Sequence, residues 1–243
     1  LDSLLMDAYY NRNNRKKSFA NWYKRMLYKS ISSPIPYAYR GKKVLDIGCG
    51  NGLFLYNLKQ AGNFDVYGVE MSDYAVQQAR TKLHLTNVKH GTLEENEFPD
   101  NFFEVITMNH VVEHLPDPKW TIKEINRILK PDGLLVITTP NTDSLFLKMF
   151  KSDWFALETP RHLSMFSKKS LAKLVSGNVN LKLKKVRYNI SNYILARSII
   201  YRFKIKNKFL SNILMKTKVF FTPFQYLLPR KKRDLITAYF LKK

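Results

Sequence analysis

Three glycines at alternate positions follow a short apolar stretch, and this pattern limits the local fold more than any other part of the sequence. The stretch is residues 44–55, VLDIGCGNGLFL, in which residues 44–47 suit a buried strand and the glycines are Gly48, Gly50 and Gly52. Glycine allows positive φ and a close approach of the backbone to a ligand, and the free N–H groups of the following helix point into the same space. The sequence therefore predicts a strand, a glycine turn and a helix that together bind a small molecule.

An acidic residue in this turn helps to choose the ligand. Asp46 lies just ahead of the glycines. A dinucleotide or phosphate-loop site brings phosphate oxygens to the helix N-terminus, where a carboxylate would repel them. The stretch also lacks the Lys-Ser/Thr ending of a phosphate loop. An acidic turn therefore favours a ligand with a cationic part, and the remaining alternative is a plain tight turn with no ligand.

A second carboxylate lies at the distance that a nucleoside ligand requires. A strand is expected over residues 64–69, and it leads into Glu70, 22 residues beyond Gly48. In a doubly wound sheet, an acidic residue at the carboxyl end of the second strand accepts hydrogen bonds from ribose hydroxyls. The alternative is a solvated carboxylate or a helix cap, but the spacing from the glycine turn favours the ribose role.

Charge is distributed unevenly along the 243 residues, whose formal net charge is +22. Residues 1–43 hold 10 basic and 2 acidic side chains, residues 44–180 hold 14 and 16, and residues 181–243 hold 17 and 1. The basic character therefore belongs to the two flanks, which favour phosphate groups of nucleic acid, anionic lipid or a diphosphate-linked substrate. Cys49 is the one cysteine, which excludes disulfides within the chain and suggests a reducing, cytoplasmic location.

Further periodic segments suggest an alternation of strands and helices. A helix is expected to begin at Asp117 and Pro118, a cap followed by a first-turn proline. A turn is expected at residues 131–133, followed by a strand. The strands after Glu70 are expected over residues 87–89, 103–108, 134–139, 181–186 and 235–241.

Several motifs resemble those of a known family. The sequence D-I-G-C-G-N-G resembles the first motif of class I S-adenosylmethionine-dependent methyltransferases. Residues 111–118 and 129–141, with Pro160, His162 and Phe166, resemble the bacterial subfamily that includes ubiquinone-type O-methyltransferases. The resemblance covers about residues 43–173. It implies an α/β fold, a doubly wound, mostly parallel seven-stranded sheet of Rossmann-like type, and S-adenosyl-L-methionine as cofactor.

The resemblance also implies which residues hold that cofactor. Thr92 occupies a position where the family often has an acidic residue, so the adenine contact is left open between Thr92, Leu93 and Glu94. No metal is required, and no cluster of metal ligands is evident in the sequence. The expected cofactor-binding residues are Asp46, Gly48, Cys49, Gly50, Gly52, Glu70, Met71, Thr92, Leu93, Glu94 and Asn109.

The expected reaction is transfer of a methyl group to a hydroxyl of a small acceptor, which is a glycan, a lipid-linked intermediate or a quinone precursor. His162 and His114 are the candidates for a general base, with His110 behind them, and the alternative for each is a packed or capping residue. An RNA methyltransferase is a second hypothesis, but the flanks are aliphatic as well as basic and no Asn/Asp-Pro-Pro-Tyr motif follows residues 103–108. A third is a non-catalytic protein that keeps the fold at a membrane surface.

The predicted organisation has a core with two basic additions. Residues 1–43 form an N-terminal basic helical cap and residues 44–190 form the cofactor-binding core. Residues 191–233 form a basic amphipathic helical insert, and residues 234–243 supply the last strand. The insert is predicted to lie on an anionic membrane surface, at the inner face of the membrane, without spanning it. A basic lid and a dimer surface are the alternatives.

Overall fold

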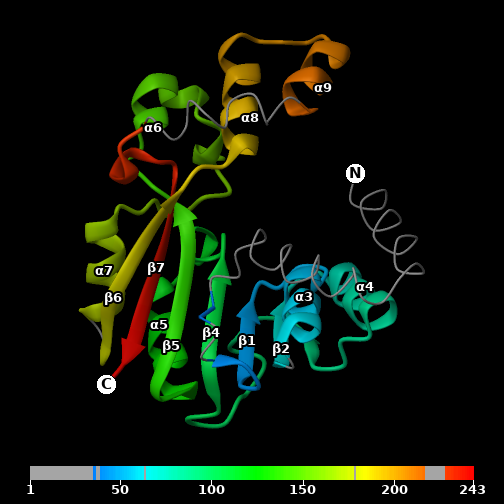
Figure 1. Ribbon diagram of the computed structural model, residues 1–243, viewed down its shortest axis with the longest axis vertical. Helices are drawn as coiled ribbons and strands as arrows, with labels where there is room; N and C mark the ends of the chain where they lie inside the picture. Colours follow the sequence, from blue (N-terminus) through cyan, green and yellow to red (C-terminus); the bar gives the residue numbers. More distant parts are fainter. Residues whose placement is uncertain (1–34, 37–38, 63, 178, 217–227) are drawn as a thin grey trace.

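The computed structural model describes residues 35–36, 39–62, 64–177, 179–216 and 228–243 (Figure 1). The predicted N-terminal helical cap lies almost wholly outside the described residues, as do residues 217–227 of the basic insert. Among the helices formed by the described residues, none combines the length and apolar character needed to cross a membrane.

The described residues form one seven-stranded sheet, with the strand order β3-β2-β1-β4-β5-β7-β6. Strand β7 runs antiparallel to its neighbours β5 and β6, while β1 to β5 pair in parallel. This arrangement confirms the predicted doubly wound, mostly parallel sheet. The strands are β1 (Lys43–Ile47), β2 (Asp65–Glu70), β3 (Val88–His90), β4 (Phe103–Asn109), β5 (Leu129–Pro140), β6 (Leu181–Asn189) and β7 (Leu235–Lys242).

Helices cover both faces of the sheet, which explains why its central strands are nearly continuous apolar runs. On one face, α5 and α7 cover Leu45 and Ile106; on the other, α3 and α4 cover Val44 and Val105. The alternation within β1 and β4 thus divides the core into two layers. The helices are α3 (Leu53–Gly62), α4 (Asp73–Leu83), α5 (Pro118–Ile128), α6 (Leu145–Phe150), α7 (Lys168–Ser176), α8 (Asn192–Arg202) and α9 (Lys208–Lys216).

The predicted turn at residues 131–133 is wrong, because these residues lie within β5. Strand β5 already pairs with β4 at Leu129, opposite Phe103, and the pairing register then shifts before Leu134. Asp132 takes a positive φ of 58° inside this irregularity. A bulge of this kind accommodates extra residues without ending the strand. The start of α5 is as predicted, with Asp117 capping the helix and Pro118 in its first turn.

A third, smaller core lies above the carboxyl ends of the sheet strands (Figure 1). It joins α6 and α8 around Trp154, whose side chain is buried. The start of α8 is fixed by Asp234, whose carboxylate accepts a hydrogen bond from the Ser191 amide at 3.0 Å. The first helix of the basic insert is therefore packed onto the body of the protein.

Candidate cofactor and acceptor site

The three glycines of the turn after β1 differ in the space beside their Cα atoms. Gly48, Gly50 and Gly52 all have positive φ, at 69°, 53° and 79°. A Cβ atom on Gly48 would lie 2.5 Å from Val111, and one on Gly52 would lie 2.6 Å from Leu85. A Cβ atom on Gly50 would meet nothing within 4 Å. Two of the glycines therefore allow close packing within the protein, while Gly50 faces open space where a ligand can approach the backbone.

Glu70 lies directly beside this turn. One of its carboxylate oxygens accepts a hydrogen bond from the Gly50 amide at 2.9 Å, and the other accepts one from the Ser72 amide at 2.9 Å. Each carboxylate oxygen has further lone pairs, so the fixed side chain can also accept hydrogen bonds from two neighbouring hydroxyls. The structure thus brings together the two features from which the sequence predicted a nucleoside site.

Asp46 lies in β1 beneath the turn and is only 3 % exposed. Its Oδ1 atom accepts hydrogen bonds from Thr107 Oγ1 at 2.6 Å and from Asn109 Nδ2 at 3.4 Å. Burial raises the pKa of Asp46 to about 7 against the effect of these hydrogen bonds, and nearby Glu70 raises it further. Asp46 is therefore only partly ionised near pH 7.

The remaining predicted cofactor residues around the turn and β2 differ in exposure. Cys49 is buried, and its Sγ would lie 2.6 Å from a Cβ added to Gly68. Burial raises the pKa of the Cys49 thiol, so it stays protonated. Met71 follows Glu70 with 72 % of its surface exposed, and its carbonyl lies 2.9 Å from His90 Nε2. Of these two side chains, Met71 is the one that a ligand can reach.

The loop after β3 carries the three candidates for the adenine contact. Leu93 is turned into the core, whereas Glu94 is exposed. The Thr92 amide donates to the carboxylate of Glu95, at 2.8 Å. Asn96, which the sequence analysis did not identify, donates from Nδ2 to the Thr92 carbonyl at 2.9 Å. This buried amide fixes the loop. In the sequence, Asn96 differs from its neighbours only in being an uncharged polar residue among glutamates.

Strand β4, which lies beside β1, is followed by a short 3-10 helix, Val112–His114, that contains Glu113. The Glu113 side chain is fully buried, and one oxygen lies 3.2 Å from His110 Nδ1. The other accepts from Thr139 Oγ1 at 3.0 Å. Burial acts to raise the pKa of Glu113, but these two contacts hold it below the usual value. Glu113 is therefore an ionised carboxylate inside the protein.

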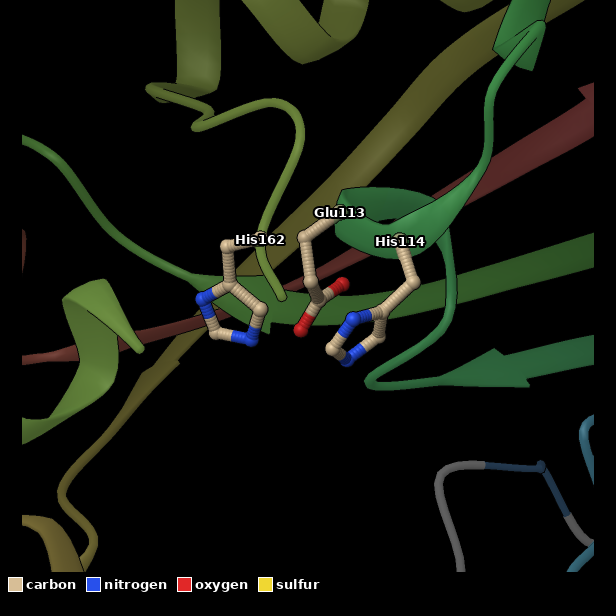
Figure 2. Close-up of side chains that lie close together, drawn as sticks. All are labelled: Glu113, His114 and His162. Carbon is tan, nitrogen blue, oxygen red and sulfur yellow. The ribbon is translucent and has the colours of Figure 1, made fainter. Parts of the chain in front are cut away.

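Two histidines, one from each side of this carboxylate, complete the group shown in Figure 2. His114 Nδ1 lies 2.9 Å from the Arg161 carbonyl, and His162 Nδ1 lies 2.8 Å from the Ala156 carbonyl. Because a carbonyl only accepts, each Nδ1 carries the proton and each Nε2 keeps a lone pair in the neutral ring. The two ring centroids are 4.6 Å apart. Burial lowers the pKa of His162, which favours its neutral form.

Backbone contacts hold the two segments of this group together. The amides of Leu163 and Ser164 both donate to the Glu113 carbonyl, at 2.8 and 3.1 Å. His162 is enclosed, with a side chain only 4 % exposed, and its Nε2 lies 3.5 Å from Glu158. The structure thus unites His114 and His162, which are far apart in sequence, but it encloses the second. The contribution of Thr139 was missed, because it depends on the register of β5 against β4.

These residues also form the group most suited to a metal ion within the described part of the chain. Donor atoms of Glu113, His114 and His162 lie within 4.8 Å of one another. One carboxylate and two imidazoles are a common ligand set for zinc or iron, and metal-binding histidines usually donate their other ring N–H to a carbonyl. The sequence analysis did not recognise this set, because its third member lies 48 residues from His114.

Comparison with known proteins places this site in a family. A family model described as a methyltransferase domain matches residues 10–185. A ubiquinone biosynthesis O-methyltransferase of Neisseria meningitidis serogroup C is 32% identical over 108 residues, covering 42% of this chain and 45% of that protein. A demethylmenaquinone methyltransferase of Staphylococcus saprophyticus is 30% identical over 135 residues, covering 53% and 58%. The aligned segments thus span about half the length of these relatives.

The fold and the site agree with this match. A putative sarcosine dimethylglycine methyltransferase from Galdieria sulphuraria has a similar structure, with a TM-score of 0.61 and 16% identity over 90% of this chain and 85% of that one. The site fits S-adenosylmethionine, because Gly50 leaves space at the backbone and Glu70 offers free acceptor capacity beside it. The chain belongs to the methyltransferase domain family, whose implied cofactor is S-adenosylmethionine.

Proposed function

We propose that this protein transfers a methyl group from S-adenosylmethionine to a hydroxyl group of a small acceptor. The observation that carries the proposal is the placement of two groups at one edge of the sheet. The turn with Gly50 and Glu70 follows β1 and β2, and Glu113 with His114 follows β4 (Figure 1). Carboxyl ends of parallel strands line the ligand crevice in doubly wound sheets.

The first group would hold the cofactor. Gly50 gives access to its backbone, and Glu70 is fixed with lone pairs left for the two ribose hydroxyls. The carboxylates of Glu70 and Asp46 give this region a negative potential, which suits a sulfonium and an ammonium group. Once bound, the cofactor supplies an activated methyl carbon. What the protein must add is alignment of the acceptor, exclusion of water and removal of the hydroxyl proton.

The second group would remove that proton. The Arg161 carbonyl holds the His114 Nδ1 proton, so the Nε2 lone pair of His114 is free to accept a proton from the acceptor hydroxyl. The buried negative charge of Glu113 would stabilise the imidazolium that forms. His162 is enclosed against this ring, so we assign it to positioning His114 and bordering the acceptor.

For the acceptor we propose a hydroxylated quinone precursor as the first compound class to test, with glycans and lipid-linked intermediates next. The names of two relatives, a ubiquinone biosynthesis O-methyltransferase and a demethylmenaquinone methyltransferase, support this order. Transfer to RNA is the competing possibility that the basic flanks raise.

The test is a methyl-transfer assay with labelled S-adenosylmethionine against hydroxylated aromatic compounds, glycans and an RNA transcript. We expect label in a hydroxylated small molecule and formation of S-adenosylhomocysteine. Label found in RNA alone would replace the proposed acceptor, and cofactor binding without any transfer would support a non-catalytic protein.

A matched pair of variants tests the role of His114. His114→Asn should lower turnover while leaving S-adenosylhomocysteine affinity unchanged, since the lost group acts on the acceptor. The control is His84→Asn, an exposed left-handed residue at the end of α4 where asparagine is well tolerated. Equal turnover in both variants would remove His114 from the mechanism.

A further inference from the structure

The described part of the basic insert carries an unusual concentration of exposed apolar side chains. Twelve large apolar residues are exposed in the described chain, and half of them lie in α8, α9 and the loop between. Phe203 and Phe209 at the two ends of this loop are 71 % and 74 % exposed. The other four are Tyr193, Tyr201, Leu210 and Ile213. A large exposed patch of this type marks an interaction surface.

The charged side chains of the same segment are all basic. Residues 192–216 contain six lysines and arginines and no aspartate or glutamate. Three of the lysines, Lys204, Lys206 and Lys208, alternate with other residues in the loop between Phe203 and Phe209. Two phenylalanines therefore flank three lysines in the middle of the insert, in a segment that we call the α8–α9 tip (residues 203–213).

Helix α8, from which the α8–α9 tip extends, is fixed to the rest of the protein. Ile194 and Leu195 of α8 are buried in the third core, and the Ser198 hydroxyl accepts a hydrogen bond from the Phe155 amide at 2.9 Å. Figure 1 shows α9 beside the upper part of α8, with both helices above the end of the sheet. The α8–α9 tip is thus carried by a helix that is fixed to the body of the protein.

We infer that the α8–α9 tip docks on an anionic lipid surface, with Phe203, Phe209 and the apolar side of α9 in the headgroup layer. Leu210 and Ile213 are three residues apart and so lie on one side of α9. Lipid bilayers are surfaces that take up aromatic and aliphatic side chains while attracting lysines to their phosphates. RNA would pair with the lysines, but it offers no apolar layer for the leucine and isoleucine.

Docking in this way would also orient the acceptor site, and this part of the inference rests on the proposed function. The third core places α8 above the same carboxyl edge of the sheet that holds Glu70 and His114. Leu163, next to His162, is also 59 % exposed near this edge. A surface-bound enzyme would therefore turn its acceptor side towards amphipathic molecules held in the lipid layer.

The test is co-sedimentation of the full chain with phosphatidylcholine vesicles, with and without phosphatidylserine, at low and high salt. Binding should require phosphatidylserine and fall with salt, because exposed charges are screened. Phe203→Ser combined with Phe209→Ser should reduce bound protein about tenfold. The control is Tyr74→Ser, which removes an aromatic side chain that is 72 % exposed on α4.

A second set of variants tests the charge. Lys204→Gln, Lys206→Gln and Lys208→Gln together should remove most of the binding, whereas Lys59→Gln, Lys119→Gln and Lys123→Gln remove the same charge elsewhere and should not. S-adenosylhomocysteine affinity should stay unchanged in every variant, which separates this result from failure of the methyl-transfer proposal. Absence of vesicle binding, equal losses in both sets, or salt-sensitive binding to RNA but not to vesicles would overturn the inference.

Discussion

Glu70 links the glycine turn to the segment before α4, beside the space where we propose that the cofactor binds. It accepts backbone hydrogen bonds from Gly50 and Ser72, so its carboxylate is oriented before any ligand arrives. A group fixed in this way loses little conformational freedom on binding, which makes its hydrogen bonds more effective.

Glu70→Ala should weaken S-adenosylhomocysteine binding by about 1–3 kcal/mol, the cost of losing charge-assisted hydrogen bonds. Isothermal titration calorimetry measures this loss, and thermal unfolding shows whether the turn itself has loosened. Glu97→Ala, an exposed carboxylate in the loop after β3, is the control. An affinity equal to that of the wild type would move the ribose contact to another residue.

Asp46 should make stability depend on pH. Its folded-state pKa of about 7 lies above the ordinary value of 3.8, because burial disfavours the charged form. Folding therefore favours the protonated carboxyl, and stability should fall as pH rises from about 4 to about 7. Asp46→Asn should flatten the decline in Tm between pH 5 and pH 8, while Asp73→Asn at the exposed start of α4 should not. An unchanged slope in Asp46→Asn would assign the decline to other groups, of which buried Asp234 is the first.

At the scale of elements, the strands and the start of α5 could be predicted because each depends on a local pattern. The apolar runs of β1 and β4 and the cap at Asp117 are examples. The bulge at Asp132 could not be predicted, since Pro-Asp-Gly favours a turn locally and the pairing with β4 that joins it to the strand lies on either side, at Leu129 and Leu134. The contact between Glu113 and Thr139 was hidden for the same reason, because strand register joins residues distant in sequence.

Asn141 connects two elements whose contact no local sequence pattern indicates. Its buried amide donates to the Arg233 carbonyl at 2.7 Å and to the Lys231 carbonyl at 3.2 Å, just before β7. Asn141→Ala should lower the free energy of unfolding by about 1–3 kcal/mol, since two partly buried carbonyls lose their donor. Urea denaturation measures this change. Asn141→Asp keeps the acceptor for the Asp143 amide but not the two donations, and a nearly wild-type stability in that variant would contradict the argument.

At the scale of the whole molecule, ligand choice gives the broadest test of the site. A ligand that binds only the folded state raises its stability, by about 2.7 kcal/mol at a hundredfold excess over Kd. S-adenosylmethionine and S-adenosylhomocysteine should raise Tm, whereas NAD and ATP should not, because the Asp46 carboxylate lies beneath the turn that their phosphates would need to approach. A rise with NAD and none with S-adenosylhomocysteine would overturn the cofactor assignment.

The order of strands also bears on how the chain is made. Strand β7 is the last of the seven to leave the ribosome, yet it lies between β5 and β6, and β6 pairs with no other strand in the described chain. Until β7 is synthesised, β5 has an open edge and β6 has no partner, and open edges invite pairing with other chains. Strands β6 and β7 must therefore wait for the synthesis of residues 235–242, so a nascent chain that stalls before residue 235 is the form most exposed to aggregation.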